Sequence, residues 1–228
     1  MQTWKRNLYL CWFGSFLTAA GMNLVIPFLP LYITELGETD HIEIWSSLAF
    51  SSTFLTAALF SPVWGKLSDR YGRKPMLLRA SLGMSIIMIL IGFATSAFQL
   101  VVLRLLMGAI AGFIPAAVIL VASQTPDEES GRALGLLSTG GVAGTLIGPV
   151  IGGLLADLVG FRQVFWITGT MLLISFVVSL FLVETSSSEQ RKKKSVSAMA
   201  VSNKEFWSLT LSIFVTTFIL QSAMMSMQ

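Results

Sequence analysis

The chain has 228 residues, of which 54% are hydrophobic and only 12% charged, with a formal net charge of +3 and a mean hydropathy of +0.76. Soluble domains usually carry about 25% charged residues. This composition therefore excludes an ordinary water-soluble domain and predicts a polytopic membrane protein.

Long apolar stretches separate the bunched charges, and each has roughly the 20 residues that a helix needs to cross a bilayer. Glycine and proline occur within them, which helices in lipid tolerate, and the alternation typical of barrel strands is absent. The first stretch is too long for the apolar part of a signal peptide. We therefore expect an all-α fold with spans at about 8–33, 44–64, 76–95, 100–121, 133–156, 164–183 and 206–227.

The basic residues indicate the orientation of these spans. Of the fifteen Lys and Arg residues, all except Arg104 and Arg162 fall on the side of the N-terminus. Short loops rich in Lys and Arg stay in the cytoplasm, so we expect a multi-pass protein of the bacterial inner membrane with a cytoplasmic N-terminus. The net charge then requires no nucleic-acid partner.

A ten-residue pattern occurs twice, 88 residues apart, in two predicted loops. Residues 65–74 and 153–162 share the frame Gly-x-Leu-small-Asp-x-x-Gly-x-basic. Three predicted spans separate the copies, so the two loops must face opposite sides of the membrane. This is the pattern of an inverted 3+3 repeat, from which many secondary transporters are built.

Composition also divides the chain into segments. Residues 1–184 hold six predicted spans, residues 185–205 form a basic linker with the run Arg191 to Lys194, and residues 206–228 hold a seventh span. We expect a six-helix bundle, a cytoplasmic linker and the first helix of an incomplete second bundle. The C-terminal bundle of the same chain is the missing partner in this interpretation.

The loop after the second span carries an acidic residue among basic ones. Asp69 lies between Lys66 and three further basic residues, and two glycines permit tight backbone geometry. One interpretation is an ordinary cytoplasmic turn. The other is a conformational latch in which Asp69 pairs with basic groups or with a helix N-terminus; its residues would be Gly65, Asp69, Arg70, Gly72, Arg73 and Lys74.

Arg104 is the one ionisable residue that we place well inside a span, with Gly108 one turn further on. Ala111, Gly112 and Pro115 would share its helical face, which could then border a cavity. The arginine could snorkel to the membrane surface, which lowers the cost of a charge in lipid. Alternatively it could be buried, where it would stabilise a carboxylate or change its proton affinity.

The fifth span has a glycine at every fourth position, which forms a stripe on one helical face and allows close approach of another helix. Pro149 lies within the stripe and favours a kink. Static packing is one interpretation. The other is a hinge and seal between bundles, formed by Gly140, Gly144, Gly148, Pro149, Gly152 and Gly153.

These motifs resemble those of the major facilitator superfamily. Residues 65–74 resemble its loop between helices two and three, and residues 104–112 resemble its helix-four motif, with Met107 and Ile110 in place of Gln and Gly. Residues 144–153 look like the helix-five signature of its antiporter branch. The chain is similar to the N-terminal half of the twelve-helix drug:proton antiporters.

The resemblance implies a monomeric exporter of lipophilic or amphiphilic compounds that confers antibiotic resistance, exchanges substrate for protons and works by rocking-bundle alternating access. It implies no cofactor, and the latch partner would lie in the absent bundle. The alternatives are a sugar or metabolite importer of the same fold, or an inactive truncated fragment. No catalytic constellation indicates an enzyme.

No carboxylate lies centrally in a span, because those near a span lie at its end: Glu35, Asp69, Asp157, Glu184 and Glu205. Either the proton carrier lies in the absent half, or Asp69 or Asp157 serves, or coupling works otherwise. Asn23 can hydrogen-bond a substrate but cannot carry a proton. We expect a substrate cavity that includes Asn23, Phe28 and Phe113. The single Cys11 allows neither a disulfide nor a cysteine metal site, and no phosphate-binding glycine loop supports a nucleotide-driven pump.

Overall fold

The computed structural model describes residues 3–182 and positions 208, 212 and 216. All regular structure in this described part is helical, which confirms the all-α prediction. The predicted linker lies outside the described residues, as does the seventh helix apart from those three positions. The helices are α1 (Thr3–Leu24), α2 (Leu29–Glu35), α3 (Ile42–Tyr71), α4 (Arg73–Gly92), α5 (Ala97–Ile110), α6 (Phe113–Gln124), α7 (Asp127–Val159) and α8 (Phe161–Leu180).

These helices supply up to six spans of sufficient length and apolarity to cross a membrane. They are α3, α4, α7 and α8, the stretch formed by α5 and α6, and the bent pair of α1 and α2. They match the first six predicted spans. Several helices are longer than predicted, because a helix can continue into polar sequence that hydropathy does not register. Helix α7, for example, begins with three acidic residues, which interact favourably with the helix dipole in a first turn.

Two spans are broken, whereas the sequence led us to expect continuous helices. The first bends by 52° between α1 and α2, and the fourth is interrupted between α5 and α6. Pro27 and Pro115 lie at or beside these breaks, and each lacks the N–H that would bond four residues back. Gly112 completes the second break with a φ of +140°, which glycine adopts without strain. The two prolines are 88 residues apart, so the repeat extends into the spans.

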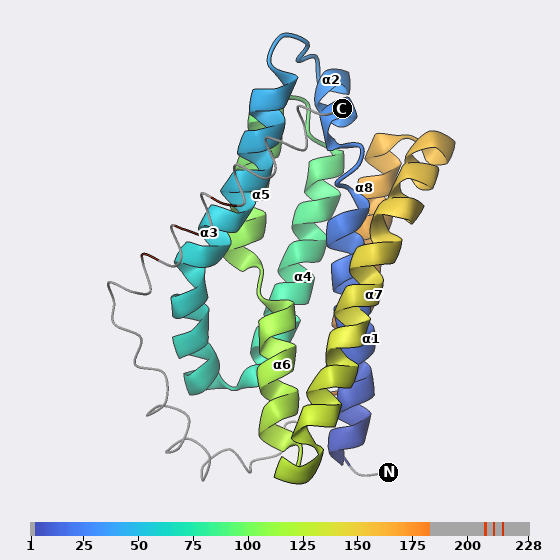
Figure 1. Ribbon diagram of the computed structural model, residues 1–228. Coiled ribbons are helices and arrows are strands. Elements are labelled where there is room, and N and C mark those ends of the chain that lie inside the picture. Colours follow the sequence, from blue (N-terminus) through green and yellow to red (C-terminus); the bar gives the residue numbers. More distant parts are fainter. Residues whose placement is uncertain (1–2, 183–207, 209–211, 213–215, 217–228) are drawn as a thin grey trace.

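The two loop motifs have the same backbone conformation. Gly72 and Gly160 have φ of +97° and +88°, and their N–H groups donate to Ser68 O at 3.1 Å and to Ala156 O at 3.0 Å. Each pair of equivalent residues is 88 positions apart. The α3–α4 turn lies at the end of the bundle that holds the N-terminus and the α7–α8 turn at the opposite end (Figure 1), so the repeats are inverted.

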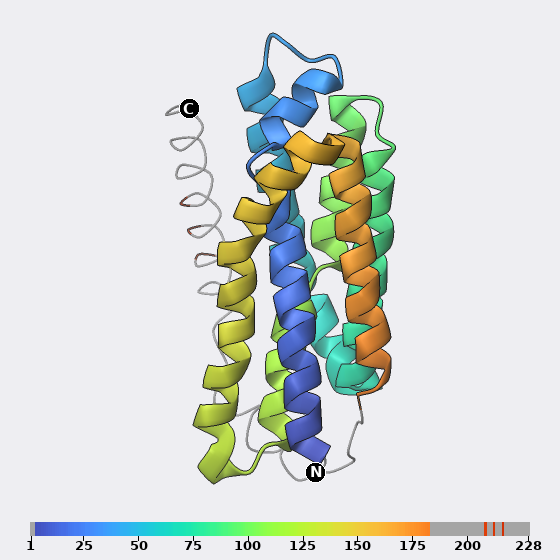
Figure 2. The same cartoon turned by 90° about the vertical axis from the view of Figure 1, so that its right-hand side faces the viewer.

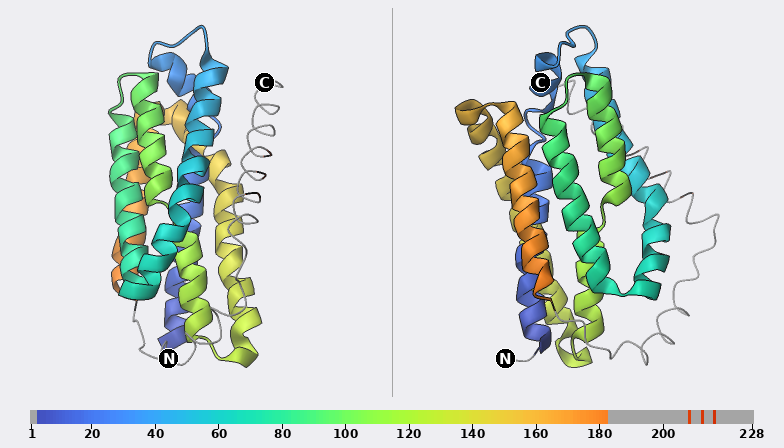
Figure 3. Two further views of the ribbon diagram at one scale, coloured as in Figure 1. Left: turned by 90° about the vertical axis from the view of Figure 1, so that its left-hand side faces the viewer. Right: turned by 180° about the vertical axis from the view of Figure 1, so that it is seen from behind.

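Helix packing follows the same symmetry. The most extensive contacts join α1 to α7, α3 to α5 and α4 to α8, and Figure 2 shows α1 beside α7, and α8 along α4. If the two repeats are exchanged, the α1–α7 contact becomes the α3–α5 contact, and the α4–α8 contact stays the same. Gly144 packs against Ala20, and Gly108 packs against Thr56. Ala20 and Gly108 are 88 positions apart, and so are Thr56 and Gly144. Figure 3 shows the interrupted α5–α6 span from behind.

Aromatic and hydrogen-bonded contacts close the end of the bundle that holds α2. Phe28 stacks on Phe161 with ring centroids 5.5 Å apart and meets Phe165 edge-on. The Tyr32 hydroxyl donates to Ile91 O at 2.8 Å. Van der Waals packing and interhelical hydrogen bonds of this kind drive helix association in lipid, so α2, α4 and α8 are fixed together at this end.

Candidate functional site

The α3–α4 turn closes on itself and on α8. Arg73 Nη2 lies 2.7 Å from Asp69 Oδ1, and Arg73 Nη1 donates to Ser68 Oγ at 2.8 Å. Lys74 Nζ donates to Leu180 O at 2.8 Å; Leu180 is the last residue of α8, where a cation complements the helix dipole. The Asp69 side chain remains 61% exposed, so its carboxylate is accessible to a further partner.

The first glycine of each loop motif has no packing explanation in the described part of the chain. A Cβ at Gly65 or at Gly153 would meet nothing within 4 Å, although most glycines inside the bundle would collide with a neighbour. The remaining latch residue, Arg70, lies against the ring of Tyr71 at 5.4 Å. The loop geometry thus pairs Asp69 with Arg73 and joins Lys74 to the end of α8, while Gly65 faces open space.

Arg104 is buried within the bundle and does not snorkel. Its side chain is 3% exposed, and its guanidinium carbon lies 5.9 Å from the Phe50 ring centroid. Neither Nε nor Nη2 has a hydrogen-bond partner among the described residues. An unpaired buried charge is costly, so this guanidinium is available to a carboxylate or an anion.

The small face predicted around Arg104 is not continuous. Gly108 packs against Thr53 and Thr56 of α3, and a Cβ there would overlap both. Ala111 and Gly112 lie in the break, and Pro115 belongs to α6, so these three do not extend the helical face of Arg104. Gly108 therefore serves close packing of α5 on α3 rather than bordering a cavity.

Arg79 is one of the basic residues that we place on the side of the N-terminus, and its position inside a helix was not predicted. It lies within α4, and its guanidinium carbon is 3.5 Å from the Trp64 ring centroid. The Trp64 indole N–H donates to Ala109 O at 2.6 Å, and so satisfies a carbonyl that the α5–α6 break leaves open. Its place inside the predicted span 76–95, as an arginine among apolar residues, was the available signal.

The glycine stripe of α7 faces α1 inside the bundle. A Cβ at Gly140, Gly144, Gly148 or Gly152 would meet backbone atoms of Trp12, Phe16, Ala20 or Leu24, on successive turns of α1. All four glycines are buried, and α7 continues as one helix through Pro149. These four positions therefore serve close packing of two parallel helices within the described bundle, and the hinge and seal between bundles stays a prediction.

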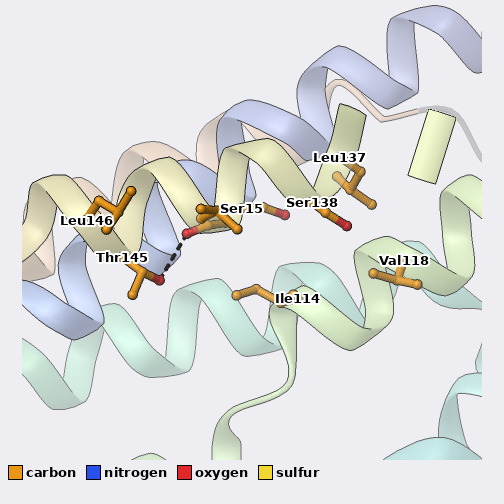
Figure 4. Close-up of a pocket in the computed structure, with 9 residues that line it drawn as sticks. Ser15, Ile114, Val118, Leu137, Ser138, Thr145 and Leu146 are labelled. Carbon is orange, nitrogen blue, oxygen red and sulfur yellow. Dashed lines mark hydrogen bonds between the residues drawn. The ribbon is translucent and has the colours of Figure 1, made fainter. Parts of the chain in front are cut away.

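A cavity of about 370 Å³ lies where α1, α6 and α7 meet (Figure 4). None of the nine residues that line it is charged: Ser15, Ile114, Val118, Leu137, Ser138, Gly141, Val142, Thr145 and Leu146. Val142 and Leu146 are exposed. Cavities of this size and largely apolar character suit small organic molecules.

Of the three residues expected at a substrate cavity, only Asn23 lies beside it. Asn23 Nδ2 donates to Ala19 O at 2.8 Å and to Thr145 Oγ1 at 3.5 Å. Phe28 and Phe113 are 2% and 1% exposed and belong to the core, the latter packed over Gly14. The structure does not bring these two rings to the cavity. The lining hydroxyls were missed because serine and threonine are common in membrane helices.

Two inverted three-span repeats, each with a broken first span, are the architecture of a secondary membrane transporter. The Major Facilitator Superfamily profile matches residues 11–228. The chain belongs to the major facilitator superfamily.

Individual relatives agree with this assignment. The chain is 53% identical over 224 residues to the "Multidrug resistance protein MdtG" of Proteus mirabilis, covering 97% of this chain and 56% of the relative. It is 52% identical to the protein of that name from Serratia proteamaculans, covering 96% and 54%, and 50% identical to that of Escherichia coli K12, covering 96% and 55%. The chain thus spans about half the length of the curated relatives it matches.

Two solved structures share the fold. The human organic anion transporter MFSD10 aligns with a TM-score of 0.68 at 17% identity, over 81% of this chain and 48% of that protein. A D-xylose-proton symporter aligns with a TM-score of 0.68 at 12% identity, over 88% and 54%. At these identities the likeness establishes the fold alone.

Proposed function

We propose that the full-length protein containing this chain is a secondary active exporter of small lipophilic or amphiphilic compounds, and that it contributes to antibiotic resistance. The observation that carries the proposal is the largely apolar, uncharged cavity between α1, α6 and α7. Relatives about half identical to the chain are named multidrug resistance proteins. In this proposal the cavity is half of the substrate site, and the missing C-terminal bundle supplies the other half.

Transport proceeds in this proposal by rocking of the two bundles around the substrate, with the described six spans moving as one body. The close backbone packing of α7 on α1 supports such a rigid body. The α3–α4 turn acts as the latch. Asp69 is paired with Arg73 but largely exposed, so it can contact the second bundle in one state and return to Arg73 in the other.

Protons are the proposed coupling ion, without a cofactor. Within the described spans no Asp or Glu lies away from a helix end, so we assign the proton-carrying carboxylate to the C-terminal bundle. The unpartnered nitrogens of Arg104 suit a buried acidic group. The distribution of basic residues supports a cytoplasmic N-terminus in the bacterial inner membrane, and the complete protein would act as a monomer.

Efflux of a fluorescent lipophilic dye tests this function. The complete gene is expressed in bacteria that lack their main efflux pumps, and dye release is followed with and without a protonophore. Release that exceeds the vector control and stops with the protonophore is expected. Release that persists with the protonophore would remove proton coupling, and release equal to the vector control at verified expression would contradict export.

A further inference from the structure

We infer that the α1–α6–α7 cavity selects compounds whose polar end carries a hydrogen-bond donor, an N–H or O–H group, beside an apolar body. The inference rests on the proposed export function and names its substrate class. The polar side chains among the lining residues are three hydroxyls: Ser15 from α1, and Ser138 and Thr145 from α7. Figure 4 shows them among apolar side chains.

The hydroxyl protons of the two α7 residues are both used in hydrogen bonds within the helix. Ser138 Oγ donates to Leu134 O at 2.9 Å, and Thr145 Oγ1 donates to Gly141 O at 3.0 Å. A hydroxyl has one proton and two acceptor positions. Asn23 Nδ2 approaches one acceptor position of Thr145 at 3.5 Å, which leaves the other. Toward the cavity, both hydroxyls therefore act only as acceptors.

Ser15 lies on α1, and Figure 4 shows it between Thr145 and Ser138 of α7. Its side chain is 1% exposed, and its Oγ has no hydrogen-bond partner within the described part of the chain. A buried hydroxyl without a partner carries a free-energy cost, which a bound polar group would relieve. Because its proton is uncommitted, Ser15 can accept from a ligand N–H or exchange hydrogen bonds with a ligand hydroxyl.

Charge does not determine selection here. The lining contains neither an acidic nor a basic side chain, so neither a bound cation nor a bound anion gains an ion pair, and of the three hydroxyls only Ser15 has a proton left to donate to an anion. The hydroxyls favour a ligand that carries a hydrogen-bond donor. Protonated amines and alcohols share this chemistry, whereas quaternary ammonium ions and ethers lack it.

Matched probe pairs test the inference in the full-length protein. One pair is a lipophilic dye with a protonated tertiary amine and its N-methyl quaternary salt, which has the same charge without the N–H. The other is an alcohol and its methyl ether. Efflux of each is compared between wild type, Thr145→Val and Ser138→Ala, with Thr170→Val as the control. Thr170 is also exposed and donates to the carbonyl four residues back, to Trp166 O at 2.9 Å, but lies on α8 away from the cavity.

We expect wild type to prefer the donor-bearing member of each pair, and the cavity variants to lose roughly three- to tenfold in apparent affinity for that member alone, the usual effect of one lost hydrogen bond. Thr170→Val should change neither member. Equal export of both members by wild type, or equal losses for both in Thr145→Val, would overturn the donor rule while leaving export established. Export of no probe by wild type would refute the export function, and the donor rule with it.

Discussion

Replacement of Gly144 by alanine should force α1 and α7 apart. A Cβ at this position would lie 2.5 Å from Phe16 O and 2.7 Å from Ala20 N, whereas ordinary contact begins at 3.4 Å. The helices must therefore separate by about 0.9 Å at this turn, and because both contacts are backbone atoms, no side-chain rotation can relieve them.

The size of the effect follows from two opposing contributions. Overpacking in a well-packed interior costs about 1–3 kcal/mol, while alanine in place of glycine in a helix gains about 0.8–1 kcal/mol. Gly153→Ala is the matched control, because it lies on the same helix and its Cβ would meet nothing within 4 Å. Gly144→Ala should lower the thermal midpoint of the detergent-solubilised protein, and Gly153→Ala should leave it unchanged or raise it.

The midpoints should differ by several degrees, since 1 kcal/mol shifts the midpoint by about 2–4 °C for chains of 150–250 residues. Scan rate and protein concentration are held equal, because unfolding of such proteins is commonly irreversible. Equal midpoints for the two alanine variants would refute the argument that the glycine stripe serves close packing of α7 on α1.

Three further substitutions address the break, the latch and the buried charge. Trp64→Phe removes the indole donor to Ala109 O and should cost about 1–3 kcal/mol of stability; an unchanged midpoint would show that water replaces the bond. Asp69→Asn breaks an exposed ion pair with Arg73, so stability should change by less than about 1 kcal/mol while efflux falls, and normal efflux at equal expression would remove the latch. Arg104→Met removes the proposed partner of a buried acidic group in the second bundle and should therefore lower the midpoint and abolish efflux; an unchanged midpoint with normal efflux at equal expression would remove this role.

Hydropathy and the loop repeat were enough to predict the spans and their inverted order, because both depend on local composition. The breaks were not predicted. Pro27 and Pro115 were visible, but a proline in a membrane helix is tolerated when neighbours satisfy the freed carbonyls, and only tertiary structure shows whether they do. Their spacing of 88 residues, equal to that of the loop motifs, was the signal that could have been used.

Site residues were harder to predict. Residue spacing shows which side chains share a helical face, but it does not show which helix packs against that face. The glycines from 140 to 152 correctly indicated close approach, but not that α1 would be the partner. Phe28 and Phe113 are bulky apolar residues that suit a cavity or a core equally well, and packing placed them in the core. Arg79 lies inside the predicted span 76–95, but its contact with the Trp64 ring depends on the packing of α4 on α3, which the sequence does not show.

Substrate protection of a cysteine shows whether the α1–α6–α7 cavity holds the transported compound. In a cysteine-free full-length protein, Thr145→Cys places a thiol in the cavity and Thr170→Cys places one on α8 outside it. The rate of labelling by a small maleimide is measured with and without a transported dye. The account predicts that the dye slows labelling at position 145 and leaves it unchanged at position 170. Labelling at position 145 that does not respond to the dye, or that slows equally at both positions, would contradict it.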